Sequence, residues 1–246
     1  MNTNAIQPIA NEPVLFVKDK KILVLSDLHI GIERDLQQSG LHICSQTYLM
    51  LNRLLFLIQQ YIPDKIVLLG DIKHNIASST IQERKDVTWF FESIKKFGEI
   101  HVVKGNHDDS IQRLVPPEII IHPSDGCILD DIGFVHGHRW PNKEIMQCDN
   151  VIIAHSHPRI VLTDRLGYKT YESCWLRGKA HHTLKQRYAS VSNITIVVMP
   201  SFNALCGGVA VNSEPLLGPF QKIIDLQHAL VYLLDGSYLG KVKDIS

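Results

Sequence analysis

Residues 22–29 read Ile-Leu-Val-Leu-Ser-Asp-Leu-His, an apolar run followed directly by Asp27 and His29. The run is typical of a short buried strand. A second apolar run precedes it at residues 14–17, and the polar residues Lys-Asp-Lys-Lys lie between the two. This pattern predicts a β-hairpin, and its second strand leads into two side chains that can bind a cation.

The same arrangement, an apolar strand followed by a polar cluster, returns four times along the chain. The later clusters are Gly70-Asp71, Lys104-Gly105-Asn106-His107-Asp108, Val135-His136-Gly137-His138 and Ala154-His155-Ser156-His157. A Gly-Asp pair after a strand is often a plain turn, and a single histidine is more often a core or surface residue than a ligand. Five such clusters together rarely arise for structural reasons. Because sites in open α/β sheets form at the carboxyl ends of strands, we expect the five clusters to meet.

The remaining hydrophobic pattern predicts helices between the early strands and closely spaced strands later. Residues 43–61 are apolar around most of a helical circumference, which predicts a largely buried helix ending before Pro63. Residues 87–97 follow amphipathic helical spacing. Short strands are expected at residues 119–121, 127–129, 132–135, 151–154, 160–162, 194–199 and 229–234. We therefore predict an α/β fold with two packed mixed β-sheets flanked by helices (an α/β/β/α sandwich), in a single domain over residues 1–246.

Composition limits the class of protein and its surroundings. The 25 Lys and Arg residues balance the 25 Asp and Glu residues, so no overall charge draws the chain to nucleic acid or membrane. The five cysteines are odd in number and widely spaced, which argues against a disulfide framework and a cysteine-type zinc site. We see neither a signal peptide nor an apolar run approaching the roughly 20 residues of a membrane helix. We expect a cytoplasmic protein without a membrane partner, and its oligomeric state stays open.

The residue types in the five clusters point to a pair of metal ions. They offer two carboxylates, one amide and four imidazoles as ligands: Asp27, His29, Asp71, Asn106, His136, His155 and His157. Mixed oxygen and nitrogen ligands suit Mn²⁺, our first choice, and also Fe²⁺ or Zn²⁺. Seven ligands exceed the needs of one ion but suit two ions that share a carboxylate. Paired metals roughly 3.5–4 Å apart clamp a phosphoryl group and activate a bridging water, so we expect phosphoester hydrolysis by a metal-bridging hydroxide.

One ligand assignment needs a choice between neighbours. His136 and His138 are two residues apart, so both project to the same side if the strand continues. We prefer His136 as the ligand because it is nearer the strand, and we keep His138 as a candidate for contact with the substrate.

These motifs resemble the calcineurin-like metallophosphoesterase superfamily, whose elements appear here in the same order. The resemblance runs over about residues 21–159, with a looser later element at residues 199–203. Residues 70–74 (Gly-Asp-Ile-Lys-His) and 135–141 (Val-His-Gly-His-Arg-Trp-Pro) are similar to a narrower branch, which includes phosphoesterases associated with DNA repair and DNA ligase gene clusters. The resemblance to this branch implies DNA-repair proteins as partners.

The resemblance also implies a role for each motif residue. Asp27, His29 and His157 would hold the first metal; Asn106, His136 and His155 would hold the second; and Asp71 would bridge them. His107 would contact the phosphate and protonate the leaving oxygen, and Asp108 would orient His107. One departure is that Lys73 and His74 stand where many members carry another acidic residue or an arginine. They are either contacts to the substrate and its surroundings or a solvated pair.

The residues that would contact the substrate are less well defined. Residues 166–192 are polar and basic with weak periodicity, which predicts an insertion or a long loop with a short helix. Within it, Arg177 to Arg187 is the densest basic stretch, and it either follows a nucleic-acid backbone, with Trp175 and Tyr188 as stacking surfaces, or is a solvated loop. The candidates for substrate contact are His74, His138, Arg139 and Arg177.

The expected activity is hydrolysis of phosphodiester bonds in nucleic acid or nucleotides. One alternative is a small-molecule phosphomonoesterase with the same metals. Another is an inactive scaffold that binds proteins, against which the complete ligand set and His107 argue.

Overall fold

The first half of the chain alternates strands and helices, as its hydrophobic pattern predicts. The computed structural model describes residues 6–41, 43–77, 79–189, 191, 193–216 and 218–245. The strands of the first sheet are, in order across the sheet, β1 (Ile6–Pro8), β2 (Leu15–Val17), β3 (Ile22–Leu25), β4 (Lys65–Leu68), β5 (Glu99–Val103) and β6 (Ile120–His122). The helices are α1 (Ile32–Gln38), α2 (Thr47–Tyr61) and α3 (Ile81–Ile94).

The predicted hairpin is confirmed, since β2 and β3 pair antiparallel, and β1 adds an antiparallel edge strand. From β3 to β6 every neighbouring pair is parallel. The carboxyl ends of β3, β4 and β5 therefore lie along one edge of this sheet, which brings the first three polar clusters to a common side.

The second half of the chain builds a second mixed sheet. Its strands are, in order across the sheet, β14 (Tyr238–Lys241), β13 (Leu230–Leu233), β11 (Lys169–Lys179), β12 (Thr195–Val198), β9 (Asn150–Ile153), β8 (Ile132–Val135) and β7 (Cys127–Leu129). A further strand, β10 (Arg159–Thr163), pairs with β11 alone. Because β8, β9 and β12 are parallel, the clusters after β8 and β9 also share one edge.

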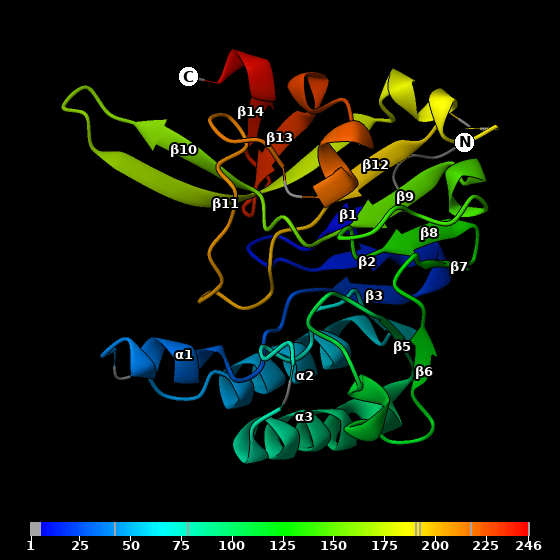
Figure 1. Cartoon of the computed structure of the whole chain (residues 1–246), viewed down its shortest axis with the longest axis vertical. Helices are drawn as coiled ribbons and strands as arrows, with labels where there is room; N and C mark the ends of the chain where they lie inside the picture. Colours follow the sequence, from blue (N-terminus) through cyan, green and yellow to red (C-terminus); the bar gives the residue numbers. More distant parts are fainter. Residues whose placement is uncertain are drawn as a thin grey trace.

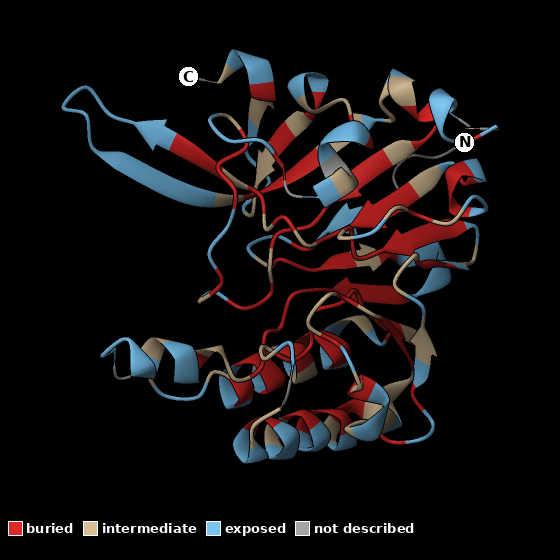
Figure 2. Cartoon of the chain, viewed as in Figure 1, coloured by how far each residue is buried: buried red, intermediate tan, exposed pale blue. Residues whose placement is uncertain are grey.

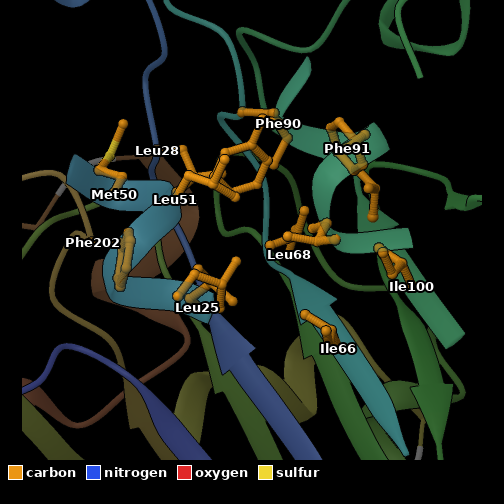
Figure 3. Close-up of a cluster of buried hydrophobic side chains, with 14 of the residues drawn as sticks. Leu25, Leu28, Met50, Leu51, Ile66, Leu68, Phe90, Phe91, Ile100 and Phe202 are labelled. Atoms are coloured by element: carbon orange, nitrogen blue, oxygen red, sulfur yellow. The ribbon is translucent and has the colours of Figure 1, made fainter. Parts of the chain in front are cut away.

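Alternation along the strands divides the apolar side chains among three cores. Ile22 and Val24 of β3 face the second sheet, where they meet residues such as Phe134 and Trp175. Leu23 and Leu25 face the opposite way and pack under α2 and α3, as Figure 3 shows for Leu25. The two sheets lie face to face (Figure 1), and their buried strands form the middle of the molecule (Figure 2). The predicted fold of two mixed sheets with flanking helices is confirmed.

Short 3-10 helices and loops, such as Ile145–Gln147 and His182–Gln186, flank the second sheet. Their apolar side chains form the third core together with the outer face of that sheet. None of the helices in the described part of the chain is both long and apolar enough to cross a lipid bilayer.

Two details of the predicted secondary structure are wrong. The segment expected as a loop over residues 166–192 contains β11, which pairs with both β12 and β13 and is therefore central to its sheet. Only its short helix, His182–Gln186, matches the prediction, and residues 190 and 192 lie outside the described residues. Helix α2 is also less buried than expected, since Tyr48, Leu49 and Phe56 are each more than half exposed.

Candidate metal centre

Sharp turns at the strand ends bring the polar clusters together. Asp27, His29, Asp71, His155 and His157 all have positive φ angles, between 41° and 70°. This left-handed region is uncommon for residues other than glycine and costs conformational energy. The turns point side chains from successive positions toward one centre. Such a concentration of strained residues at one place is typical of a functional site.

Asp71 lies at the middle of this centre. Its Oδ2 atom is 3.3 Å from Nε2 of His136, 3.6 Å from Nε2 of His29 and 3.9 Å from Nε2 of His107. Its Oδ1 atom accepts a hydrogen bond of 2.9 Å from the main-chain N–H of His107. The side chain is buried, so this carboxylate is held in place with imidazoles on several sides.

Asp27 is the second buried carboxylate, and its Oδ1 atom is 3.1 Å from Nε2 of His157. Two groups of ligand atoms, each within 4.8 Å of one another, overlap at Asp71: one is Asp27, His29 and Asp71, and the other is Asp71, His136 and His155. Two adjacent groups of potential ligands thus share one carboxylate.

Several ligand-type atoms at this centre are buried without a hydrogen-bond partner among the described residues. They are both carboxylate oxygens of Asp27, Oδ1 of Asn106, and Nε2 of His29, His136 and His157. Buried polar atoms are almost always satisfied in folded proteins, because leaving one unpaired costs roughly 1–3 kcal/mol. Three of these residues, His29, Asn106 and His157, line a cavity of about 480 Å³. Cations bound among these side chains would give the unpaired atoms their partners.

In two of the histidines, the ring nitrogen that faces away from the centre forms a hydrogen bond, as is usual for imidazoles that bind metals. Nδ1 of His136 is 2.8 Å from the carbonyl oxygen of Leu69, and Nδ1 of His157 is 2.9 Å from that of Gly207. In each ring Nδ1–H donates to the carbonyl, so Nε2 is the nitrogen that faces the centre. Both rings are therefore held in the orientation in which a metal would be bound through Nε2.

The electrostatics of the centre favour a cation. Burial raises the pKa of Asp27, but the imidazole of His157 outweighs it and lowers the pKa below its usual value. The pKa of Asp71 is lowered in the same way by His136. Burial lowers the pKa of His29 to about 3 and that of His155 to about 4. At neutral pH the carboxylates are charged and these imidazoles neutral, which are the forms that bind metals.

The pKa of His136 shifts in the opposite direction. Burial lowers it, but the charge of Asp71 outweighs burial and raises it to about 9. A proton on His136 thus offsets the negative charge of Asp71, and a metal ion bound by both residues would take the place of that proton.

Close approach of the main chain requires glycine at two positions. A Cβ atom on Gly105 would overlap both the carboxylate and the main-chain nitrogen of Asp71, and one on Gly70 would overlap the ring of His136. Gly70 also has a φ of +81°, which side chains rarely adopt. The glycines in Gly70-Asp71 and Gly105-Asn106 therefore allow the two loops to interlock around the ligands.

Asp108, which was expected to orient His107, bonds to main-chain groups in this structure. Its buried carboxylate accepts hydrogen bonds from the main-chain N–H groups of Gly105 and Ile72, both at 2.8 Å, and none from His107. Burial raises the pKa of Asp108 to about 6. Asp108 thus joins the loop of Asp71 to the loop of His107. The ring of His107 is held instead by a contact from Nδ1 to the carbonyl oxygen of His74.

His74, a candidate for contact with the substrate, lies at the centre and lines its cavity. Its Nδ1 atom is 3.3 Å from Nδ1 of His29, and its Nε2 atom is 3.0 Å from the carboxylate of Asp35. Its main-chain N–H donates to the buried carboxylate of Glu83, which also caps α3 in a capping box with Thr80. The start of α3 therefore fixes the loop that carries His74.

Sequence reasoning missed one residue of the centre. The thiol of Cys206 lies close enough to His29 and His157 to form a third group of potential ligands. Burial raises its pKa strongly, so the thiol is protonated in the metal-free protein. The local sequence, a single cysteine before two glycines, does not predict that Cys206 lies beside these histidines. Its place depends on how the chain folds back toward the centre after β12.

His138 and Arg139 lie beside the centre and open a second hollow. The ring of His138 is 5.3 Å from that of His136 and 6.0 Å from that of His155, measured between ring centroids. His138 also lines a neighbouring cavity of about 580 Å³ together with Arg139, Trp140 and Lys222. A smaller hollow of about 260 Å³ shares Trp140 and Lys222 and adds Arg187. A basic groove thus leads away from the predicted ligands; its cations are Arg139, Lys222 and Arg187.

The basic stretch from Arg177 to Arg187 does not form one surface. The guanidinium of Arg187 lies 4.4 Å from the ring centroid of Trp140, in the groove. Arg177, which was predicted to contact the substrate, lines a different cavity that shares no residue with the centre. The structure does not bring Arg177 to the centre, because β11 carries this residue into the second sheet. Trp175 and Tyr188 are buried and do not offer free stacking surfaces.

The sequence and the structure of the chain were compared with those of known proteins. The family described as calcineurin-like phosphoesterase matches residues 20–198. A search of curated protein sequences finds no match. The chain is similar in fold to the crystal structure of the Pseudomonas putida nuclease MPE, with a TM-score of 0.60, 18% identity, and coverage of 94% of this chain and 97% of that one. The Escherichia coli phosphoesterase Yfce aligns with a TM-score of 0.44 and 17% identity, over 89% of this chain and 97% of that one.

Proposed function

The chain belongs to the calcineurin-like phosphoesterase family, and from this premise we propose that it hydrolyses phosphodiester bonds with the help of two divalent metal ions. The observation that carries the proposal is the pair of ligand groups that overlap at Asp71. The buried ligand atoms without partners among the described residues support it further.

We assign Asp27, His29 and His157 to one ion, with the 3.1 Å contact between His157 and Asp27 as support. Asn106, His136 and His155 are assigned to the other ion, and Asp71 to both. Mn²⁺ is the first choice, with Fe²⁺ or Zn²⁺ as alternatives, because the set of oxygen and nitrogen ligands suits all three. When bound, two such ions supply Lewis acidity toward a phosphoryl oxygen and an activated water as nucleophile.

We assign to His107 the transfer of a proton to the leaving group. Its Nδ1 atom contacts the carbonyl oxygen of His74, which fixes the ring, and its Nε2 atom faces Asp71 across 3.9 Å. The side chain lines the cavity and is only partly buried, so a substrate can reach it. Histidine is the side chain that serves most often as a general acid or base in enzymes.

The basic groove favours a substrate that extends beyond the reacting phosphate. Arg139, Lys222 and Arg187 are exposed, and none of them forms an ion pair with a described residue. A chain of phosphates would supply their counter-ions, whereas a small monoester reaches only the centre itself. We therefore propose nucleic acid or an oligonucleotide as the substrate class.

Metal-dependent activity on a simple diester is the direct test of the proposed function. We expect the purified protein with Mn²⁺ to hydrolyse bis-p-nitrophenyl phosphate faster than p-nitrophenyl phosphate, and a chelator to abolish both activities. Preference for the monoester would indicate a phosphatase. Absence of activity on both substrates, with no metal in the purified protein, would indicate the scaffold alternative.

Neutralising the groove tests the substrate class separately from the chemistry. The triple variant Arg139→Ala, Lys222→Ala, Arg187→Ala is expected to lower kcat/KM for a single-stranded oligonucleotide by at least tenfold. Affinity should also become less dependent on salt. The negative slope of log affinity against log salt concentration should become shallower by about 2, because each of the three lost phosphate contacts contributes about 0.7 to its magnitude. Turnover of bis-p-nitrophenyl phosphate should change less than threefold.

The matched control removes three exposed lysines elsewhere, Lys18, Lys20 and Lys85, and so changes the net charge equally. This control should leave oligonucleotide turnover within about twofold of the wild type. Equal losses in both triple variants would mean that overall charge, and not the groove, governs the activity.

A further inference from the structure

A second cavity, of about 310 Å³, lies between the two sheets and shares no lining residue with the metal centre. Its walls come from both sheets, with Leu15 of β2 on one side and Trp175, Arg177 and Tyr232 of β11 and β13 on the other. The volume falls at the lower end of the range of about 300–1,000 Å³ that is usual for small-molecule sites. Nothing in the proposed phosphoesterase activity uses this cavity.

Arg177 brings a positive charge into the cavity without a counter-ion. The residue is half-buried, and no described residue forms an ion pair or a hydrogen bond with its guanidinium. Arginine is always charged at physiological pH and carries five N–H donors. Because a partly buried charge without a partner is unfavourable, this position favours an anion.

Trp175 adds a second donor to the same cavity wall. It is 2% exposed, and its Nε1–H has no acceptor among the described residues. A buried indole N–H usually finds an acceptor. Trp175 and Arg177 are two residues apart on β11, so they project from the same face of the strand. The cavity thus presents two donors without acceptors, and one of them is a cation.

The rest of the wall is largely apolar. Leu15, Val197 and Tyr232 are among the residues that line it. We propose that this cavity binds a small amphipathic organic anion, such as an aromatic carboxylate. Its carboxylate would accept from Arg177 and Trp175, and its apolar body would pack on the remaining wall. An inorganic anion would leave the apolar wall uncovered, and a neutral molecule would leave Arg177 without a counter-ion.

A binding experiment tests this proposal, with 3-phenylpropanoate as the probe and the uncharged 3-phenylpropanamide, which has the same carbon skeleton, as the control ligand. The chain has three tryptophans, so a ¹H–¹⁵N spectrum shows three indole N–H signals, and Trp175→Phe identifies that of Trp175. Titration of the intact protein in the presence of a chelator is expected to shift the Trp175 signal saturably with the acid. The amide should bind at least tenfold more weakly. Because the metal centre is empty in this experiment, the outcome does not depend on the proposed activity.

Variants then distinguish the contribution of the Arg177 charge to binding from that of the rest of the cavity wall. Arg177→Gln is expected to weaken binding of the acid at least tenfold, with an unchanged melting temperature as evidence of folding. Arg165→Gln removes an exposed arginine at the β10–β11 hairpin and should not alter binding. Either of two results would overturn the proposal: no saturable shift of the Trp175 signal with the acid, or equal affinity for acid and amide in the wild type.

Discussion

Replacing Asp71 by alanine is expected to reduce metal-dependent diester hydrolysis on the order of a thousandfold, which corresponds to about 4 kcal/mol of transition-state stabilisation. The purified variant should also lose bound metal. Among the described residues, Asp71 alone belongs to both of the ligand groups that contain a carboxylate, and its Oδ2 atom lies within 4 Å of three imidazoles. Alanine would remove the proposed shared ligand, and with it much of the buried negative charge that we propose attracts two cations.

The experiment measures kcat/KM on bis-p-nitrophenyl phosphate and metal content by mass spectrometry in the same preparations. Asp71→Asn keeps the volume of the side chain and an acceptor for the N–H of His107, so it tests charge without loss of packing. Asp109→Ala removes an exposed carboxylate from the neighbouring loop and should behave as wild type. Full metal content and activity in Asp71→Asn would contradict the bridging role.

His107→Ala is expected to lower kcat by about 10²–10⁴-fold, the range that general acid–base groups contribute, while metal content stays unchanged. The main-chain N–H of His107 holds Asp71, and this contact survives the loss of the side chain. The effect should depend on the leaving group. p-Nitrophenolate leaves without a proton at neutral pH, whereas an alkoxide does not. The loss should therefore be larger for a dinucleotide than for bis-p-nitrophenyl phosphate.

Steady-state kinetics on the two substrates check this dependence, with His182→Ala as a control for loss of an exposed imidazole. Equal losses on both substrates would show that His107 binds the phosphate without protonating the leaving oxygen. Loss of metal from His107→Ala would show instead that its ring acts as a ligand.

Much of this centre follows from local sequence patterns. Each predicted ligand from Asp27 to His157 belongs to a polar cluster that follows a short apolar run, and the runs form strands as expected. Because parallel strands run in the same direction, their carboxyl ends come to one edge of each sheet without any further information. The hydrophobic alternation of β3 likewise determined that one face meets the second sheet and the other meets the helices.

Strand β11 was not predicted from the sequence because its two halves lie in different environments. Its first half pairs only with β10 in a hairpin that projects from the molecule (Figure 1) and is exposed, whereas Cys174, Trp175 and Leu176 are buried in the sheet. Neither a regular alternation nor a continuous apolar run results, so the periodicity is weak. Its position between β12 and β13 separates Arg177 from Arg187, although the two are only ten residues apart.

The sequence by itself determined which residues gather at the strand ends, since that depends only on local patterns and on the geometry of parallel sheets. Only the tertiary structure decided which contacts hold these residues in position. Asp108 bonds to Ile72, 36 residues away, and His107 to the carbonyl of His74, 33 residues away. Cys206 reaches His29 through the return of the chain after β12. Such contacts leave no periodic trace in the sequence, because they join loops whose separation along the chain is set by the packing of whole sheets and helices.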